Sequence, residues 1–110
     1  MTQRGFIIDL DGTVFDWGSL IFLPEIPEQL KRMHECGRDI LFVTMRGHPS
    51  IDSSGLPGEQ ETRDRLDSLG IDYRLIWAFA SPRTLVDDDE RSSLVIVQRN
   101  DGWEFDEDHA

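Results

Sequence analysis

The sequence predicts an α/β protein with a single domain built on a mostly parallel β-sheet. Short apolar runs of strand length alternate along the chain with segments whose apolar residues recur at helical spacing. The chain has 110 residues, of which 38% are hydrophobic and 30% are charged, and this size supports one hydrophobic core with no room for a second. We therefore treat residues 1–110 as one domain.

The first half of the chain is predicted to form a strand, a linker, a helix and a second strand. Residues 6–8 are a continuous apolar run, typical of a strand buried on both faces. After a linker at 14–23, Pro27 indicates the first turn of a helix, and Gly37 stands where that helix should end. The second strand follows at once, at residues 39–43.

The second half begins with a loop at residues 47–58, which is rich in glycine, proline and serine and which we expect to be mobile. A polar helix over 59–68 follows and is closed by Gly70. Further apolar runs then indicate strands, and an Asn-Asp-Gly turn predicts a short C-terminal edge hairpin before an acidic tail. These segments are 73–79, 83–86 and 94–97 (strands), 100–102 (turn), 103–105 (edge strand) and 106–110 (tail).

A short connection constrains the third predicted strand, because only residues 80–82 separate it from the fourth. A parallel crossover needs about a dozen residues or more, and three extended residues span roughly 10 Å. We therefore expect 75–79 to be a short or irregular strand, with the connection running extended beneath the sheet.

The charge balance limits the class of partner. With 11 basic and 22 acidic residues the formal net charge is −11, which argues against nucleic acid, because such a partner requires clustered Lys and Arg. A phosphorylated small molecule remains compatible if a metal ion supplies positive charge. The sequence shows no signal peptide or membrane-spanning stretch, and the single Cys36 has no internal disulfide partner. We expect a cytoplasmic protein without membrane contacts, in which Cys36 is a buried helix residue.

Three predicted strands end in residues that suit a metal and phosphate site. The carboxyl ends of parallel strands meet at one edge of the sheet, where ligands bind in such folds. Acidic side chains gathered there repel one another unless a cation compensates them, and hard oxygen ligands suit Mg²⁺. An aspartate beside a metal-bound phosphate can also act as a nucleophile and form an acyl phosphate. The residues concerned are Asp9 and Asp11, Thr44 and Arg46, and Asp87 and Asp88, and the four aspartates are the expected metal ligands.

The segment Asp9-Leu10-Asp11-Gly12-Thr13, which follows an apolar strand, resembles the first motif of the haloacid dehalogenase (HAD) superfamily of phosphatases and phosphotransferases. The resemblance implies a HAD-like, Rossmannoid fold with Asp9 as nucleophile and metal ligand. It also implies that Asp11 is the general acid and base and offers its backbone carbonyl to the metal. We expect Gly12 and Thr13 to contact substrate.

Later segments resemble the same family and extend the resemblance over most of the chain. Thr44 closes the second strand as the family's second motif does, which implies a hydroxyl contact to a phosphate oxygen. Asp87 and Asp88 resemble its acidic fourth motif. The small capless members associated with surface-sugar biosynthesis or phage genomes are similar in two further segments, Leu69-Gly70-Ile71-Asp72-Tyr73 and Arg99-Asn100-Asp101-Gly102.

The family's third motif, a lysine that neutralises the phosphoaspartate, has no counterpart in this chain. The single lysine, Lys31, lies in the first predicted helix. Arg83 is the nearest substitute and Arg46 the second, although a guanidinium is not equivalent to an ammonium group. We therefore expect Arg83 in the catalytic set and Arg46 among the substrate contacts.

The resulting hypothesis is a capless, Mg²⁺-dependent phosphatase that hydrolyses a phosphomonoester of a small metabolite, sugar or nucleotide through an aspartyl phosphate. A non-catalytic HAD-like binding module is the alternative that the missing lysine favours, and a receiver-type phosphoacceptor switch is a third. The open site would be covered by the 47–58 loop, by the flap that carries Trp17, or by a second copy of the chain in a homo-oligomer. Trp17 either stacks on a substrate ring or packs within the flap.

Overall fold

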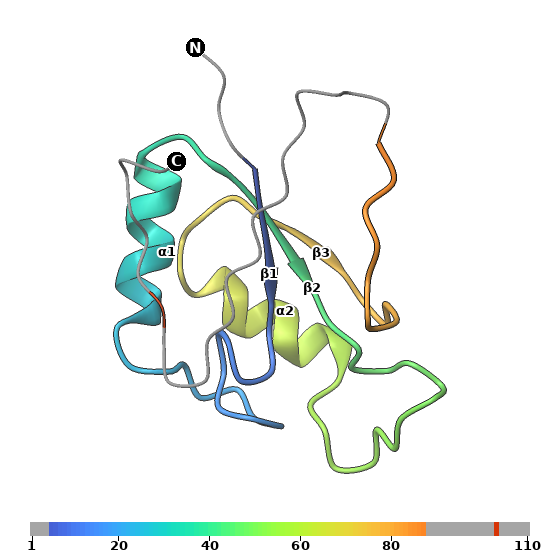
Figure 1. Cartoon of the computed structure of the whole chain (residues 1–110). Coiled ribbons are helices and arrows are strands. Elements are labelled where there is room, and N and C mark those ends of the chain that lie inside the picture. Colours follow the sequence, from blue (N-terminus) through green and yellow to red (C-terminus); the bar gives the residue numbers. More distant parts are fainter. Residues whose placement is uncertain (1–4, 88–102, 104–110) are drawn as a thin grey trace.

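A computed structural model describes residues 5–87 and 103 of the chain. Within them lies a small α/β unit whose three strands form one parallel sheet in the order β1-β2-β3, with a helix in each connection (Figure 1). The α/β class predicted from the sequence is confirmed. The elements are β1 (Gly5–Asp9), α1 (Ile26–Glu35), β2 (Asp39–Val43), α2 (Glu59–Asp67) and β3 (Arg74–Ile76).

The register of the sheet brings the carboxyl ends of all three strands to one level. β1 and β2 pair along their whole length, so that Asp9 lies opposite Val43. β3 pairs with the end of β2, and its last residue, Ile76, is also opposite Val43. The backbone N–H of Thr44 then donates to the Ile76 carbonyl at 3.2 Å. Residues that directly follow β1 and β2 therefore lie side by side at this edge.

One hydrophobic core joins the sheet to both helices. Ile8 and Phe42 from the strands pack in the same cluster as Leu30 and Met33 of α1 and Leu66 of α2. Side chains alternate between the two faces of a strand, and Ile7, next to the buried Ile8, is 54% exposed. The prediction that residues 6–8 are buried on both faces is therefore wrong.

The helix boundaries follow the predicted signals. Pro27 lies in the first turn of α1, and Gly37 takes a φ of 74°, a conformation that residues with a Cβ rarely adopt. Gly70, with a φ of 68°, comes shortly after α2. Cys36 is the residue that caps α1 and is only partly buried, so the prediction of a buried helix residue is wrong. No described helix has the length and apolar character needed to cross a membrane.

The segment after β3 departs most from the prediction. β3 is as short as expected, with three residues. The predicted strand at 83–86 is wrong, since these residues form no strand and Val86 is 89% exposed. An apolar run becomes a strand only where a neighbouring strand pairs with it, and no described strand does so here.

Near the C-terminus only Trp103 is described, and it is not in a strand, which contradicts the predicted edge strand at that residue. Its indole N–H instead donates to the Thr13 carbonyl at 2.9 Å. The predicted strand 94–97, the turn 100–102 and the tail 106–110 lie outside the described residues.

Candidate active site

The loop after β1 is a tight turn that places two aspartates at the edge of the sheet. The backbone N–H groups of Thr13, Val14 and Phe15 all donate to the Leu10 carbonyl, at 2.9–3.2 Å. Gly12 takes a φ of 79°, which the turn requires and which glycine adopts without strain. Leu10 is fully buried, so the neighbouring Asp9 and Asp11 are held in place on either side of it.

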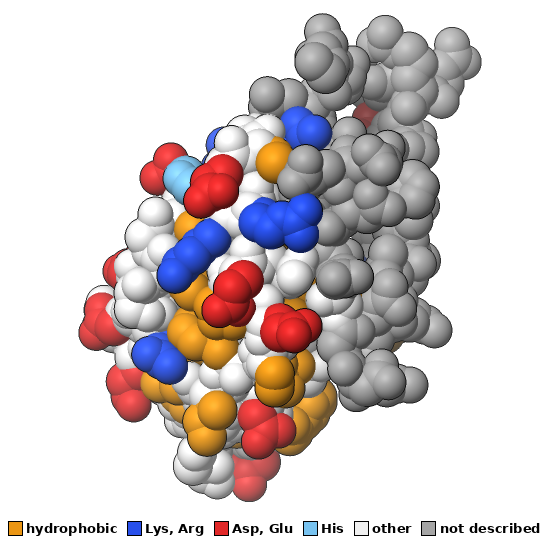
Figure 2. Space-filling model, turned by 90° about the vertical axis from the view of Figure 1, so that its left-hand side faces the viewer, with side chains coloured by type: hydrophobic (Ala, Val, Ile, Leu, Met, Phe, Trp, Pro, Cys, Tyr) orange, Lys and Arg blue, Asp and Glu red, His pale blue; other side chains and the backbone are white. Residues whose placement is uncertain are grey.

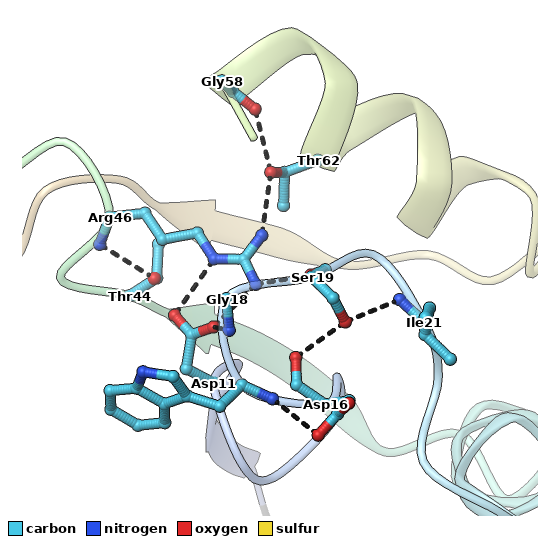
Figure 3. Close-up of polar contacts among 10 residues, drawn as sticks. Asp11, Asp16, Gly18, Ser19, Ile21, Thr44, Arg46, Gly58 and Thr62 are labelled. Atoms are coloured by element: carbon cyan, nitrogen blue, oxygen red, sulfur yellow. Dashed lines mark hydrogen bonds and ion pairs between the residues drawn. The ribbon is translucent and has the colours of Figure 1, made fainter. Parts of the chain in front are cut away.

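Arg46 lies at the centre of the site (Figure 3). Its side chain is fully buried and meets the Asp11 carboxylate at two points, Nε to Oδ2 at 3.0 Å and Nη2 to Oδ1 at 2.7 Å. Nη2 also donates to the Ser19 carbonyl at 2.6 Å, and Nη1 to Thr62 Oγ1 at 3.4 Å. The guanidinium thus joins the turn after β1, the flap and α2. The Phe15 ring, 5.3 Å from the guanidinium carbon, completes its surroundings.

The Asp11 carboxylate is correspondingly well bound. Besides the two contacts with Arg46, its Oδ1 accepts a hydrogen bond from the Gly18 backbone N–H at 2.9 Å. The Asp11 side chain is 16% exposed. A charge with so little access to water requires a partner of opposite sign, and Arg46 supplies it. In this structure the Arg46 guanidinium neutralises the Asp11 carboxylate, and it has no exposed surface that a substrate could contact.

Thr44 is the residue that directly follows β2, and it is fully buried. Its Oγ1 accepts a hydrogen bond from the Arg46 backbone N–H at 3.1 Å, and its carbonyl accepts one from the Phe79 N–H at 2.8 Å. Thr44 therefore links the ends of β2 and β3. A hydroxyl that accepts one bond keeps its own proton to donate, which is the role expected toward a phosphate oxygen.

Asp9 differs from Asp11 in its surroundings. Its side chain is 41% exposed, and its nearest cation is Arg83, with Nη1 at 3.9 Å from Oδ1. Burial raises the pKa of the Asp9 carboxyl above 3.8, and the nearby Asp11 raises it further. Arg83 acts against the burial and lowers this pKa. Asp9 is thus an accessible carboxylate, incompletely solvated and beside a positive charge.

Arg83 lies in the irregular segment after β3, and its side chain is 24% exposed. Its guanidinium lies 5.8 Å from the centre of the Phe79 ring. Of the two arginines that the sequence offered in place of the missing lysine, Arg83 is the one beside Asp9, and Arg46 is committed to Asp11. The two arginines therefore neutralise different aspartates, and only Arg83 is placed to act on Asp9.

The carboxylates at this edge of the sheet are the groups that a magnesium ion would meet. The described residues contain no group of three acidic, histidine or cysteine side chains able to hold a metal. Asp87 is accordingly not gathered with Asp9 and Asp11, and Asp88 lies outside the described residues. One or two carboxylates with water and substrate phosphate are nevertheless the usual ligands of Mg²⁺. The accessible Asp9 carboxylate, with Asp11 two residues on, fits that donor chemistry.

Sequence reasoning missed three residues of the site, namely Ser19, Thr62 and Arg65. Ser19 contributes a backbone carbonyl, which leaves no trace in the residue type. Arg65 of α2 donates from Nε to the next flap carbonyl, that of Leu20, at 3.0 Å. Thr62 had a usable signal, because it lies four residues before Leu66 and so shares the buried face of an otherwise polar helix.

A hollow of about 460 Å³ lies at the opposite end of the sheet. Arg38 and Arg74 line it together with Asp39 and Asp72, so that its charges balance, and His34 accepts a hydrogen bond there from the Asp72 N–H at 3.4 Å. The face of the molecule shown in Figure 2 likewise has acidic and basic side chains interspersed, with no separate basic patch among the coloured residues. The chemically distinct groups of the described chain are therefore those after β1 and β2.

Comparison of the chain with protein-family models, with curated proteins and with solved structures finds no match. The geometry around Asp9 and Asp11 is therefore the basis for assigning a function.

Proposed function

We propose that the protein is a Mg²⁺-dependent phosphatase that hydrolyses a phosphomonoester through a phosphoryl group carried on Asp9. The observation that supports it most is the position of Asp9 at the end of β1, accessible to solvent and 3.9 Å from the Arg83 guanidinium. A carboxylate nucleophile needs both an open approach and a positive charge to offset its repulsion from an anionic phosphoryl group. Asp9 has both.

In the proposed reaction, an Asp9 oxygen attacks phosphorus while the bond from phosphorus to the leaving oxygen breaks. Arg83 holds the phosphoryl oxygens. Thr44 is fully buried in this structure, so it donates its hydroxyl proton to one of them only if the residues that cover it move aside. Asp11, in its protonated form, gives that proton to the leaving oxygen. In the second step Asp11 takes a proton from water, the water oxygen attacks phosphorus, and the bond from Asp9 to phosphorus breaks to release inorganic phosphate.

Asp9 and Asp11 are the residues that would hold the magnesium ion. When bound, such an ion neutralises part of the charge on the phosphate oxygens. The residues themselves set a further condition, because both Asp11 oxygens accept hydrogen bonds in this structure. Asp11 can exchange a proton with the substrate only if one of these contacts with Arg46 opens during the reaction.

That pairing also favours a second candidate, a binding module without turnover. If the contact between Arg46 and Asp11 stays closed, Asp11 has no oxygen free for proton transfer. Asp9 and Arg83 would then still bind magnesium and a phosphate group. The two candidates share a ligand and differ in whether phosphate is released.

The deciding experiment measures phosphate release from a panel of sugar, nucleotide and small-metabolite monoesters, with Mg²⁺ and with a chelator. We expect release that needs Mg²⁺ and that falls to background in Asp9→Asn. The matched control is Asp72→Asn, which removes the same charge at the opposite end of the sheet and should leave the rate unchanged.

Calorimetry separates the candidates if no ester is hydrolysed. If the wild type binds Mg²⁺ without releasing phosphate from any ester, and Asp9→Asn does not bind it, the protein is a binding module and not a phosphatase. Equal rates of release in the wild type and Asp9→Asn would exclude Asp9 as the nucleophile.

A further inference from the structure

Trp17 is placed unlike the other tryptophans of the chain. Its residue is 78% exposed, whereas Trp77 and Trp103 are both partly buried. The Trp77 indole lies against Gly47, and the Trp103 indole N–H is hydrogen-bonded. A tryptophan is the side chain with the largest apolar surface to bury. Trp17 leaves most of that surface uncovered.

The exposed indole lies beside the catalytic turn. A Cβ added to Gly12 would lie 3.6 Å from Trp17 Cε3, so the indole edge touches the residue that follows Asp11. The substitution of Gly12 would be strained in any case because of its positive φ. The ring is therefore next to the turn that follows Asp9, the residue proposed to receive the phosphoryl group.

The flap that carries Trp17, residues 14–23, is held firmly at its tip and at its base. At the tip, Ser19 Oγ donates to the Asp16 carbonyl at 2.8 Å, and the Ile21 N–H donates to Ser19 Oγ at 3.0 Å. At the base, the Phe15 and Phe22 rings stack with their centres 5.1 Å apart.

Two arginines fix the flap to the rest of the site. Arg46 binds the Ser19 carbonyl at 2.6 Å, and Arg65 binds the Leu20 carbonyl at 3.0 Å. The Arg65 guanidinium also lies 4.5 Å from the centre of the Phe22 ring. A ring carried on such a backbone binds a ligand without first having to order a loop, and this lowers the cost of binding.

From this placement we propose that Trp17 is a stacking surface for a planar aromatic ring in the substrate, and that the substrate class is the nucleoside monophosphates. The proposal rests on the phosphatase function, because it takes the phosphoryl group to lie at Asp9. Every nucleobase has a flat π-face that can stack on an indole, whatever its pattern of hydrogen-bond donors and acceptors. The net charge of −11 favours a single nucleotide over a polynucleotide.

The test compares ligands with and without a base on the full wild-type chain, which keeps Asp9 as a ligand for Mg²⁺, and each monoester is used as its non-hydrolysable phosphonate analogue so that no ligand is consumed. Calorimetry with Mg²⁺ would measure the affinities of AMP and CMP against those of ribose 5-phosphate and inorganic phosphate. Stacking of one base on a tryptophan predicts about tenfold tighter binding of the nucleotides. Trp17→Ala should abolish this difference, and Trp17→Phe should keep most of it.

Ile21→Ala is the matched control, because Ile21 is 65% exposed on the same flap and is not placed in the site. It should keep the full preference, and the far-ultraviolet circular dichroism spectrum of every variant should match the parent. The proposal is overturned if nucleotides do not bind, if they bind no better than ribose 5-phosphate, or if Trp17→Ala keeps the preference.

These outcomes remain distinct from failure of the phosphatase function. Hydrolysis of phosphomonoesters with no preference for a base would leave the phosphatase in place and exclude the stacking surface. A nucleotide preference that depends on Trp17, in a protein that hydrolyses nothing, would support the stacking surface and exclude the phosphatase.

Discussion

Arg46 and Asp11 form a buried two-point ion pair that joins the residues following β2 and β1, with the two contacts at 3.0 and 2.7 Å. The same guanidinium binds a flap carbonyl and a threonine of α2. The turn after β1 thus depends on a side chain that is itself inaccessible to a ligand.

Replacing Arg46 by methionine should destabilise the fold strongly. The variant keeps most of the side-chain volume but leaves the Asp11 carboxylate without its cation, and removing one partner of a buried pair costs about 3–5 kcal/mol. Arg63→Met is the control, because Arg63 makes a 2.9 Å ion pair with Glu59 on the surface of α2, where such pairs contribute about 1 kcal/mol or less. Urea unfolding measures the free energy of unfolding of both variants, and similar losses of stability in the two would contradict the prediction.

Gly47 and Gly55 form a matched pair for testing how closely the loop approaches β3. Both have positive φ, 81° and 80°, so alanine is strained at either position. A Cβ at Gly47 would also collide with the Trp77 indole, whereas one at Gly55 meets nothing within 4 Å. Gly47→Ala should therefore lose about 1–3 kcal/mol more stability than Gly55→Ala. Trp77→Ala should remove that difference when combined with each substitution, and a persistent difference would exclude the collision as its cause.

Asp9 and Asp52 should affect stability with opposite dependence on pH. Burial raises the pKa of Asp9 above 3.8, so the folded state binds a proton more readily and the ionised carboxylate costs stability as pH rises through the folded pKa. Hydrogen bonds from Ser54 lower the pKa of Asp52, so its contribution is present above pH 3.8 and is lost as pH falls through the folded pKa. Between acid and neutral pH, Asp9→Asn should gain stability relative to the wild type and Asp52→Asn should lose it. Changes of the same sign in urea unfolding would refute this.

The pH dependence of hydrolysis should reveal the part played by Arg83. Its charge lowers the pKa of Asp9, and Asp9 must be ionised if it is to act as the proposed nucleophile. In Arg83→Met the acidic limb of kcat/KM should therefore move to higher pH, while Arg83→Lys should keep it near its original place. Arg74→Met, an exposed arginine at the opposite end of β3, is the control and should not move the limb. An unmoved limb in Arg83→Met would show that Arg83 does not act on Asp9.

Tyr73 offers a readout of the packing between α2 and β3, since it is the only tyrosine of the chain. Its hydroxyl donates to Asp67 Oδ1 at 2.7 Å, and burial together with this bond raises its pKa from 10.0 to about 12. Absorbance at alkaline pH should show a midpoint near that value. Because the folded pKa is the higher one, Tyr73 stabilises the fold below pH 10 and loses that contribution as pH rises toward about 12. A midpoint at the ordinary value would mean that the contact with Asp67 is absent in solution.

The helices and the parallel sheet could be predicted because their signals are local. Pro27 and Gly37 mark the two ends of α1, and the apolar residues of β1 and β2 need only their own neighbours to be recognised. The run at 83–86 has equally good local signals but no strand beside it among the described residues. Pairing between strands is decided by parts of the chain far apart in sequence.

The site could be predicted only as a set of residue types. The motif that follows β1 predicts Asp9 and Asp11, and the lack of a suitably placed lysine indicates Arg83 as the cation. The burial of Arg46 could not be predicted, because its partners Ser19 and Thr62 lie far away in sequence. A buried arginine is recognised by its partners, and these are known only once the chain is folded.

The contact between Arg46 and Thr62 has a consequence for how the protein tolerates change. These two residues stand just before and just after the 47–58 loop, and their hydrogen bond closes the loop at its base. Insertions or deletions in the middle of this loop, away from Gly47 and from the start of α2 at Glu59, mainly alter loop closure, and doubling the length of a flexible loop costs only about 0.6 kcal/mol. The loop can therefore vary in length and sequence while the aspartates stay where they are, and new ligand contacts can be acquired there without rebuilding the site.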